Sequence, residues 1–400
     1  MKRAVLAIIC IANVIGAPLR TQAQQRPEAL ATVSQLPNLG DGNEMTISAE
    51  RRMGDRIARE IYRDPDYIDD PLLTEYLQGI WQPLLAAARL RGELPPELDE
   101  RFAFELMVGK DRSVNAFALP GGYFGVHLGL MAVVTSRDEL ASVLGHELSH
   151  VTQRHIARLI AKQGAQTPWL VGAMILGVLA ASKSADTANA LIVGGQAVAA
   201  QNQLNFSRDM EREADRIGFG VMTQAGFEPQ GFVTLFDKLA QASRHNDSGS
   251  FPYLRSHPLT TERIADMQAR MPARSPGSAA VAAPATSLEH AMLSARSRVL
   301  SYSAVDELRS WSAQIASPAF ASLEVPRKAA SLYGAALAAI RLRNFPEGAA
   351  MHSRLVELTK ANAAAARLTR LLAMELALAG DDAPRALSLV SDGAAGATRP

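Results

Sequence analysis

The sequence has almost no cysteine. Its 400 residues contain a single one, Cys10. It follows Ile8 and Ile9 rather than a small residue and lies too early for lipid attachment, inside a leader that we expect to be removed. The mature chain then has no disulfide and no thiolate that could act as a nucleophile or bind a metal ion.

The sequence also lacks an excess of charge of either sign. Lysine and arginine number 41 against 40 aspartate and glutamate, a formal net charge of +1. Removal of the leader takes away three basic residues, so that 38 face 40 and the net charge becomes −2. Binding of nucleic acid needs a basic surface, so we expect no nucleic-acid partner.

The third absence is an apolar run long enough to span a bilayer, which takes about 20 residues in a helix. The run from Ala4 to Ala17 follows Lys2 and Arg3 and precedes Thr21-Gln22-Ala23. A charged start, a short apolar core and small residues before the cut are typical of a secretory signal peptide. We therefore expect residues 1–23 to be cleaved and the protein to be secreted; the alternative is an uncleaved anchor.

Two further apolar runs lie within residues 169–200, separated by the polar SKSADT. Each has about a dozen residues, too few to cross a membrane. They predict a helical hairpin that packs on its own domain, lies over a cleft, or makes peripheral contact with a membrane. Packing is the favoured interpretation.

The stretch from Ser136 to Gly164 has the pattern of one helix. Ser136 and Glu139 form a capping-box sequence at its start, apolar residues recur at helical spacing, and Gly164 suits a left-handed helix end.

Inside this helix lies His146-Glu147-Leu148-Ser149-His150. At about 100° per residue, two imidazoles four apart project from the same face. This spacing offers two nitrogen ligands to one zinc ion and leaves Glu147 beside it as a general base. His155, nine residues after His146, is half a turn out of phase and is expected on the surface.

A second helix is predicted from Ser207 to Ala225, ended by Gly226. Glu211 and Asp215 lie four apart on one of its faces. A carboxylate from a second helix is the third ligand of a His₂Glu catalytic zinc site, which favours Glu211 as a ligand. Asp215 could then hold a ligand histidine through its other ring N–H. The alternative is an ordinary solvated face on a charged helix.

His257 precedes a proline, which favours an extended backbone and a defined ring direction. Its ring could donate a hydrogen bond to the oxyanion of a tetrahedral intermediate, occupy the open position of the zinc, or lie in a surface loop.

Residues 115–127 predict two strands joined at Pro120-Gly121-Gly122. They are either the wall of a cleft that pairs with an extended peptide or a plain hairpin.

Residues 271–287 are rich in alanine, proline and serine and predict a linker. They separate a domain over 24–270 from a helical region over 288–390, and residues 391–400 are expected to form a disordered tail. Two predicted helix pairs, 329–358 and 363–390, suggest tetratricopeptide-like repeats.

With these motifs in place, the chain resembles periplasmic zinc metallopeptidases of the beta-barrel assembly-enhancing type, which are related to the CAAX-prenyl-protease and HtpX-like peptidases. The resemblance covers roughly residues 36–270 and rests on five segments. They are DPLLTEYL, NAFALPGG, LASVLGHELSHVTQRHIAR, FSRDMEREADRIG and SHPLTTERI.

The resemblance implies an α+β fold: a mostly helical zincin-type (gluzincin) domain with a small β-sheet, followed by helical tetratricopeptide-like repeats. It also implies zinc on His146, His150 and Glu211, with Glu147 as base. Asp215 would contact a ligand rather than the zinc itself, and His257 would lie near the metal. The repeats could contact the outer-membrane protein assembly machinery.

We therefore expect one Zn²⁺ per chain and hydrolysis of peptide bonds in misfolded or stalled polypeptides. Zinc would lower the pKa of a bound water, and Glu147 would take its proton and return it to the leaving amine. The main alternative is a chaperone-like assembly scaffold with a largely silent zinc site. A zinc hydrolase that acts on non-peptide amides is a second one.

Overall fold

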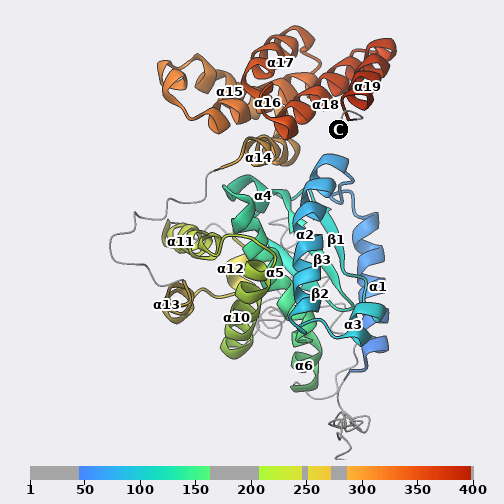
Figure 1. The fold of residues 1–400 in the computed structure, drawn as a ribbon, viewed down its shortest axis with the longest axis vertical. Coiled ribbons are helices and arrows are strands. Elements are labelled where there is room, and N and C mark those ends of the chain that lie inside the picture. Colours follow the sequence, from blue (N-terminus) through green and yellow to red (C-terminus); the bar gives the residue numbers. More distant parts are fainter. Residues whose placement is uncertain (1–44, 163–206, 246–250, 272–285, 398–400) are drawn as a thin grey trace, which may run out of the picture. The chain divides into compact units, whose positions relative to one another are not determined.

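The computed structural model describes residues 45–162, 207–245, 251–271 and 286–397. These residues form helices around one small sheet (Figure 1). The described helices before residue 272 are α1 (Ile47–Arg63), α2 (Pro71–Leu90), α3 (Pro96–Arg101), α4 (Leu128–Val133), α5 (Arg137–Thr152), α6 (His155–Lys162), α10 (Arg208–Gln224), α11 (Gln230–His245), α12 (Tyr253–Ser256) and α13 (Thr261–Ala269).

The sheet consists of β1 (Glu105–Gly109), β2 (Ala116–Leu119) and β3 (Tyr123–His127) in the order β1-β3-β2. β1 runs parallel to β3, and β2 pairs with β3 antiparallel. Gly121 and Gly122 form the turn with φ of +75° and +82°, values that glycine adopts without steric cost. The predicted strand pair is thus confirmed, and among the described strands β2 lies at an edge.

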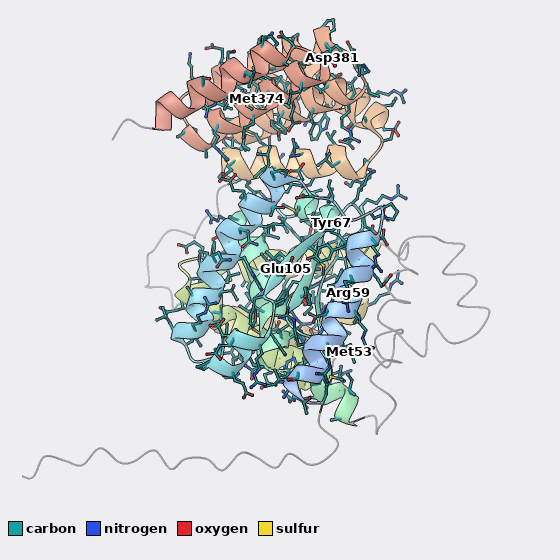
Figure 2. All side chains as sticks on the ribbon, turned by 90° about the vertical axis from the view of Figure 1, so that its right-hand side faces the viewer. Met53, Arg59, Tyr67, Glu105, Met374 and Asp381 are labelled. Atoms are coloured by element: carbon teal, nitrogen blue, oxygen red, sulfur yellow. The ribbon has the colours of Figure 1, made fainter. Side chains whose placement is uncertain are left out.

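Side chains alternate between the two faces of the sheet, as a strand period of two requires. Met107 and Tyr123 pack with Met53 and Ile57 of α1 on one face; Figure 2 shows α1, with Met53 labelled, alongside the strands. The opposite face belongs to the main core, in which the ring of Phe124 meets Trp81 edge to face at 4.6 Å. The sheet is thereby held between helices.

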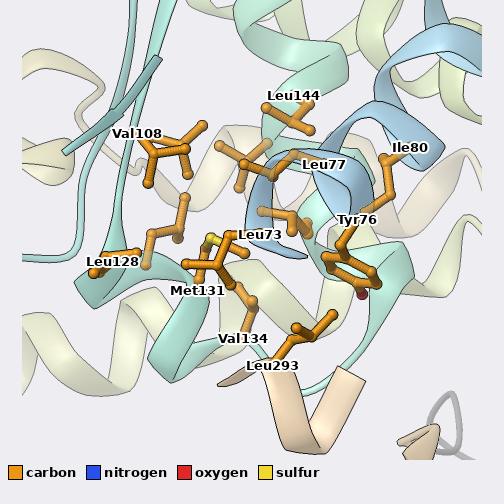
Figure 3. Packing of buried hydrophobic residues seen from close by; sticks show 14 of the residues in the cluster. Leu73, Tyr76, Leu77, Ile80, Val108, Leu128, Met131, Val134, Leu144 and Leu293 are labelled. Atoms are coloured by element: carbon orange, nitrogen blue, oxygen red, sulfur yellow. The ribbon is translucent and has the colours of Figure 1, made fainter. Parts of the chain in front are cut away.

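The main core brings α2, β1, α4 and α5 together. Figure 3 shows Leu73 and Leu77 of α2 directed toward Val108, Leu128 and Leu144. All five side chains are buried, and full burial of one such side chain stabilises the fold by about 1.5–3 kcal/mol. This core fixes α5 against the sheet.

Helix α5 begins where the sequence predicted but ends early. Ser136 Oγ accepts from the backbone N–H of Glu139 at 3.1 Å, whereas the Glu139 carboxylate accepts from the Thr135 N–H rather than from Ser136. The expectation of one helix as far as Gly164 is wrong. The helix breaks at Gln153 and Arg154, where Arg154 has φ +51°, and α6 then starts in a new direction.

The C-terminal part is helical throughout the described residues: α14 (Leu288–Ser301), α15 (Ala304–Ala316), the 3₁₀ turn η1 (Pro318–Ser322), α16 (Val325–Arg341), α17 (Phe345–Thr359), α18 (Ala363–Ala379) and α19 (Ala383–Ala397). The two predicted helix pairs are confirmed as helices, and their assignment as tetratricopeptide-like repeats stays a prediction. The disordered tail predicted for 391–400 is wrong for residues 391–397, because α19 continues through them.

Helix α14 connects this part to the helices around the sheet. His290 Nε2 donates to the carbonyl of Val134 at 2.9 Å, and its Nδ1 lies 2.6 Å from the hydroxyl of Tyr76. Arg296 binds both oxygens of Asp70, the cap of α2. One continuous core includes Leu73, Leu293 and Leu332, so α14 packs in a core that both parts share.

Among the described helices, none has the length and apolar character needed to span a membrane. The predicted signal peptide (1–23), the apolar hairpin (169–200) and most of the linker (271–287) lie outside the described residues.

Candidate metal centre

Three elements converge on one buried cluster. His146 and His150 come from α5, Glu211 from α10, and His257 follows α12, and all four are 1–2% exposed. One ligand atom from each lies within 4.8 Å of all the others. The Nε2 atoms of His146 and His150 are 3.0 Å apart, as expected for two imidazoles one turn apart on a helix.

Two glycines let α5 and α10 approach closely. A Cβ built on Gly218 of α10 would lie 2.9 Å from the carbonyl carbon of Gly145 in α5. Because neither residue has a side chain, the two backbones are in contact at Gly145, which directly precedes His146, and at Gly218, two turns after Glu211. This approach brings Glu211 within 3.5 Å of both His146 and His150 (Oε2 to His146 Nε2, Oε1 to His150 Nε2).

His257 is the fourth member of the cluster. Its Nδ1 lies 3.0 Å from Glu211 Oε1 and 3.3 Å from His146 Nε2, and its Nε2 lies 3.5 Å from Glu147 Oε1. The ring stacks on Tyr253, with centroids 4.7 Å apart. At 2% exposed, His257 is not the surface-loop residue that the sequence left open as an alternative. The sequence analysis did not single out Tyr253.

Asp215 and Arg263 form hydrogen bonds and ion pairs with residues of the cluster. Asp215 Oδ1 lies 2.9 Å from His146 Nδ1, which is the contact the sequence predicted for a ligand histidine. Arg263 donates to both Asp215 oxygens at 2.6 and 2.8 Å. It also donates to the carbonyl of Pro258 at 2.9 Å and reaches Glu211 Oε2 at 2.8 Å. The sequence analysis missed this role of Arg263, since no local spacing relates residues 48 apart.

His155 corrects a prediction. It was expected on the surface, yet it is 0% exposed, because the break before α6 turns it back toward α5. Its Nδ1 lies 2.8 Å from His150 Nδ1, and its Nε2 lies 3.1 Å from Glu213 Oε2. Glu213 lies two residues after Glu211 in α10, about 200° around the helix axis, and meets His155.

The buried charges shift several pKa values. Burial opposes a positive charge on His146, yet hydrogen bonds to Asp215 and Glu211 outweigh it and raise the pKa of His146 to about 9. Burial and the charge of His146 lower the pKa of His150 well below its ordinary value. Burial also lowers the pKa of His155, to about 4. His150 therefore offers an unprotonated ring nitrogen at neutral pH.

Glu147 differs from the other members of the site. It is 1% exposed, and neither carboxylate oxygen makes a well-formed hydrogen bond with a described residue. Burial raises the pKa of Glu147, and the charges of His257 and His146 and the Ala118 amide in the edge strand β2 oppose the rise only in part. A buried carboxylate of this kind needs a partner and has the properties of a general base.

These observations fit a transition-metal ion. Two imidazoles and a carboxylate from a second helix are the ligands of catalytic His₂Glu zinc sites, with a further imidazole in reach at His257. Glu147 lies beside the four clustered side chains rather than among them, 3.5 Å from His257. A purely structural zinc site has no need of such a residue.

Comparison with known proteins agrees with this geometry. Residues 71–271 match Peptidase family M48. The chain is 31% identical to the beta-barrel assembly-enhancing protease of Escherichia coli (strain K12) over 272 residues, 68% of this chain and 52% of that protein. It is 34% identical to that of Yersinia pestis over 237 residues, 59% of this chain and 47% of that protein.

A eukaryotic relative is the mitochondrial metalloendopeptidase OMA1 of Saccharomyces cerevisiae, 29% identical over 201 residues, 49% of this chain and 55% of that protein. The chain spans about half the length of these curated relatives. The family match extends from the start of α2 to just beyond α13 and thus includes every residue of the buried cluster. The chain belongs to peptidase family M48, a family of metallopeptidases.

Proposed function

We propose that this protein is a zinc-dependent endopeptidase of the bacterial periplasm, with His146, His150 and Glu211 as zinc ligands. The observation that carries the proposal is the convergence of these ligand atoms, with that of His257, within 4.8 Å. The buried carboxylate of Glu147 beside them adds the base that hydrolysis needs.

When bound, zinc lowers the pKa of a coordinated water to about 7 and polarises a carbonyl group. Glu147 takes a proton from the attacking water and delivers it to the leaving amine. Its raised pKa suits both steps, because a carboxyl that protonates nearer to neutral pH accepts and returns a proton more readily. Asp215 and Arg263 keep the ring of His146 in one orientation.

The substrate is proposed to be an extended polypeptide. Strand β2 pairs on one side with β3, and among the described strands its other side has no partner. The Ala118 amide of β2 is one of the groups that interact with Glu147, so a peptide added to this edge would lie along the site. The names of the bacterial relatives include beta-barrel assembly, which supports misfolded or stalled outer-membrane proteins as substrates and their assembly machinery as a partner.

His257 is proposed to be a fourth zinc ligand that keeps the enzyme latent. Its Nδ1 lies 3.0–3.3 Å from atoms of Glu211 and His146, so His257 would be able to join them in holding one metal ion. An oxyanion donor would instead stand away from the ligands, where a substrate carbonyl binds. Hydrolysis would then require the ring of His257 to move away and admit a water.

The test is digestion of an unfolded protein such as reduced casein by residues 24–400 with zinc. We expect cleavage after His257→Ala, weaker cleavage by the wild type, and none by Glu147→Gln at unchanged zinc content. Turnover by Glu147→Gln would refute its role as base. If every variant is inert while zinc is bound, and Glu147→Gln still rescues an outer-membrane defect, the scaffold alternative is correct.

A further inference from the structure

The break between α5 and α6 places the imidazole of His155 against the Nδ1 side of His150, one of the proposed metal ligands. On an unbroken helix, His155 would lie about 140° around the axis from His150. Instead, Arg154 adopts φ +51°, and its guanidinium binds the buried carboxylate of Glu50 at 3.0 Å. His155 then starts α6 with its Nδ1 2.8 Å from His150 Nδ1.

The protons along this contact can be assigned from the chemistry of the ligand. His150 presents Nε2 to the cluster, 3.0 Å from His146 Nε2. A ring nitrogen that binds a metal carries no proton, so the proton of the neutral ring is on Nδ1. Nδ1 of His150 therefore donates, and Nδ1 of His155 must accept.

The hydrogen bonds continue from His155 toward the surface. With Nδ1 of His155 accepting, its proton is on Nε2, which lies 3.1 Å from Glu213 Oε2 and donates to it. Arg158 donates to the same oxygen at 2.8 Å. Each donor in this series meets one acceptor, and the exposed fraction of the side chain rises from 0% at His155 to 29% at Glu213 and 44% at Arg158.

We propose that His155 and Glu213 are positioning residues that fix the ring and tautomer of His150 for metal binding. The inference rests on the proposed metal site and adds a second support to it. His146 is held by a carboxylate directly, through Asp215, whereas His150 is held by a carboxylate through an intervening imidazole. A ligand that donates its other N–H in this way binds metal more strongly.

A purely structural role for His155 would be to fill the space between α5 and the start of α6. The two roles predict different effects for different substitutions of His155. His155→Phe fills the same space but cannot accept a hydrogen bond. His155→Asn is smaller, but its Oδ1 can stand near the position of Nδ1 and accept from His150.

The experiment measures the zinc affinity of residues 24–400 by competition with a chromophoric chelator, and the visible spectrum of the Co²⁺-loaded protein. Outer contacts of this kind are worth about 10–100-fold in metal affinity. We expect a loss of this size for His155→Phe together with an altered Co²⁺ spectrum, a smaller loss for His155→Asn, and a measurable loss for Glu213→Gln. The control, Asp209→Asn, removes an exposed carboxylate on α10 that pairs with Arg212 and should change neither quantity.

Wild-type affinity and spectrum in His155→Phe would overturn the inference, as would equal losses in His155→Phe and His155→Asn, which would assign the effect to shape. Should His155→Phe not fold, the comparison of Glu213→Gln with Asp209→Asn decides. His146→Ala separates this inference from the proposed function. If the wild type binds zinc, His146→Ala does not, and the His155 variants match the wild type, only the positioning role fails. If His146→Ala binds as well as the wild type, the metal site itself is wrong.

Discussion

The substitution Gly218→Ala tests how closely the two ligand-bearing helices must approach. A Cβ at this position would lie 2.9 Å from the carbonyl carbon of Gly145 and from the backbone nitrogen of His146, whereas ordinary contacts are 3.4–4 Å. Both contacted atoms belong to the backbone of α5 and cannot rotate away. Helix α10 must therefore shift by about 0.5–1 Å in a close-packed interior.

Two opposing terms set the effect on stability. Alanine is favoured over glycine in a helix interior by about 1 kcal/mol, while overpacking costs about 1–3 kcal/mol. The free energy of unfolding should thus fall by about 0–2 kcal/mol. The metal site should suffer more, because Glu211 moves with α10 and ligand distances must hold to about 0.2 Å. We expect the zinc affinity to fall by at least about tenfold.

The matched control is Gly220→Ala, two residues along the same helix. The three atoms nearest to a Cβ on Gly220 all belong to the guanidinium of Arg91, which can move aside, so this variant should gain stability and keep its zinc affinity. The assays are the melting temperature of the metal-free protein and the zinc affinity by chelator competition. If Gly218→Ala matches Gly220→Ala in both, the approach of the helices does not limit the site.

Two further predictions concern the contacts of α14. Burial lowers the pKa of His290 below its ordinary 6.5, so protonation of the unfolded chain should reduce stability as the pH falls below 6.5, by at most about 1.4 kcal/mol per pH unit. Denaturant unfolding from pH 7.5 to 5.5 should show a shallower loss in His290→Gln, and equal slopes would contradict the reasoning. Asp70→Ala removes a helix cap and one partner of the buried Arg296, which among the described residues then keeps Glu375 as its carboxylate partner. It should cost about 3 kcal/mol in urea unfolding. Asp99→Ala breaks a more exposed pair, with Arg89, and should cost less than about 1 kcal/mol; similar values for the two would be inconsistent with a buried ion pair.

The features of the site that depend on neighbouring residues follow from the sequence. Ser136 and Ser207 start α5 and α10 because each side chain accepts from a backbone N–H of the first turn. Within α5, the helical repeat alone puts His146 and His150 on one face. The same repeat aligns Glu211 with Asp215.

The remaining features depend on contacts between distant segments, which only the tertiary structure determines. Arg263 meets Asp215 across 48 residues, and His257 reaches His146 across 111. His155 is the clearest example. The helical repeat predicts its direction only while the hydrogen-bond ladder of α5 continues. That ladder ends at Arg154, where the contact with Glu50, 104 residues earlier, helps to hold the break. The sequence thus determined which residues could bind a metal ion, and the packing of α1, α5 and α10 decided which side chains support them.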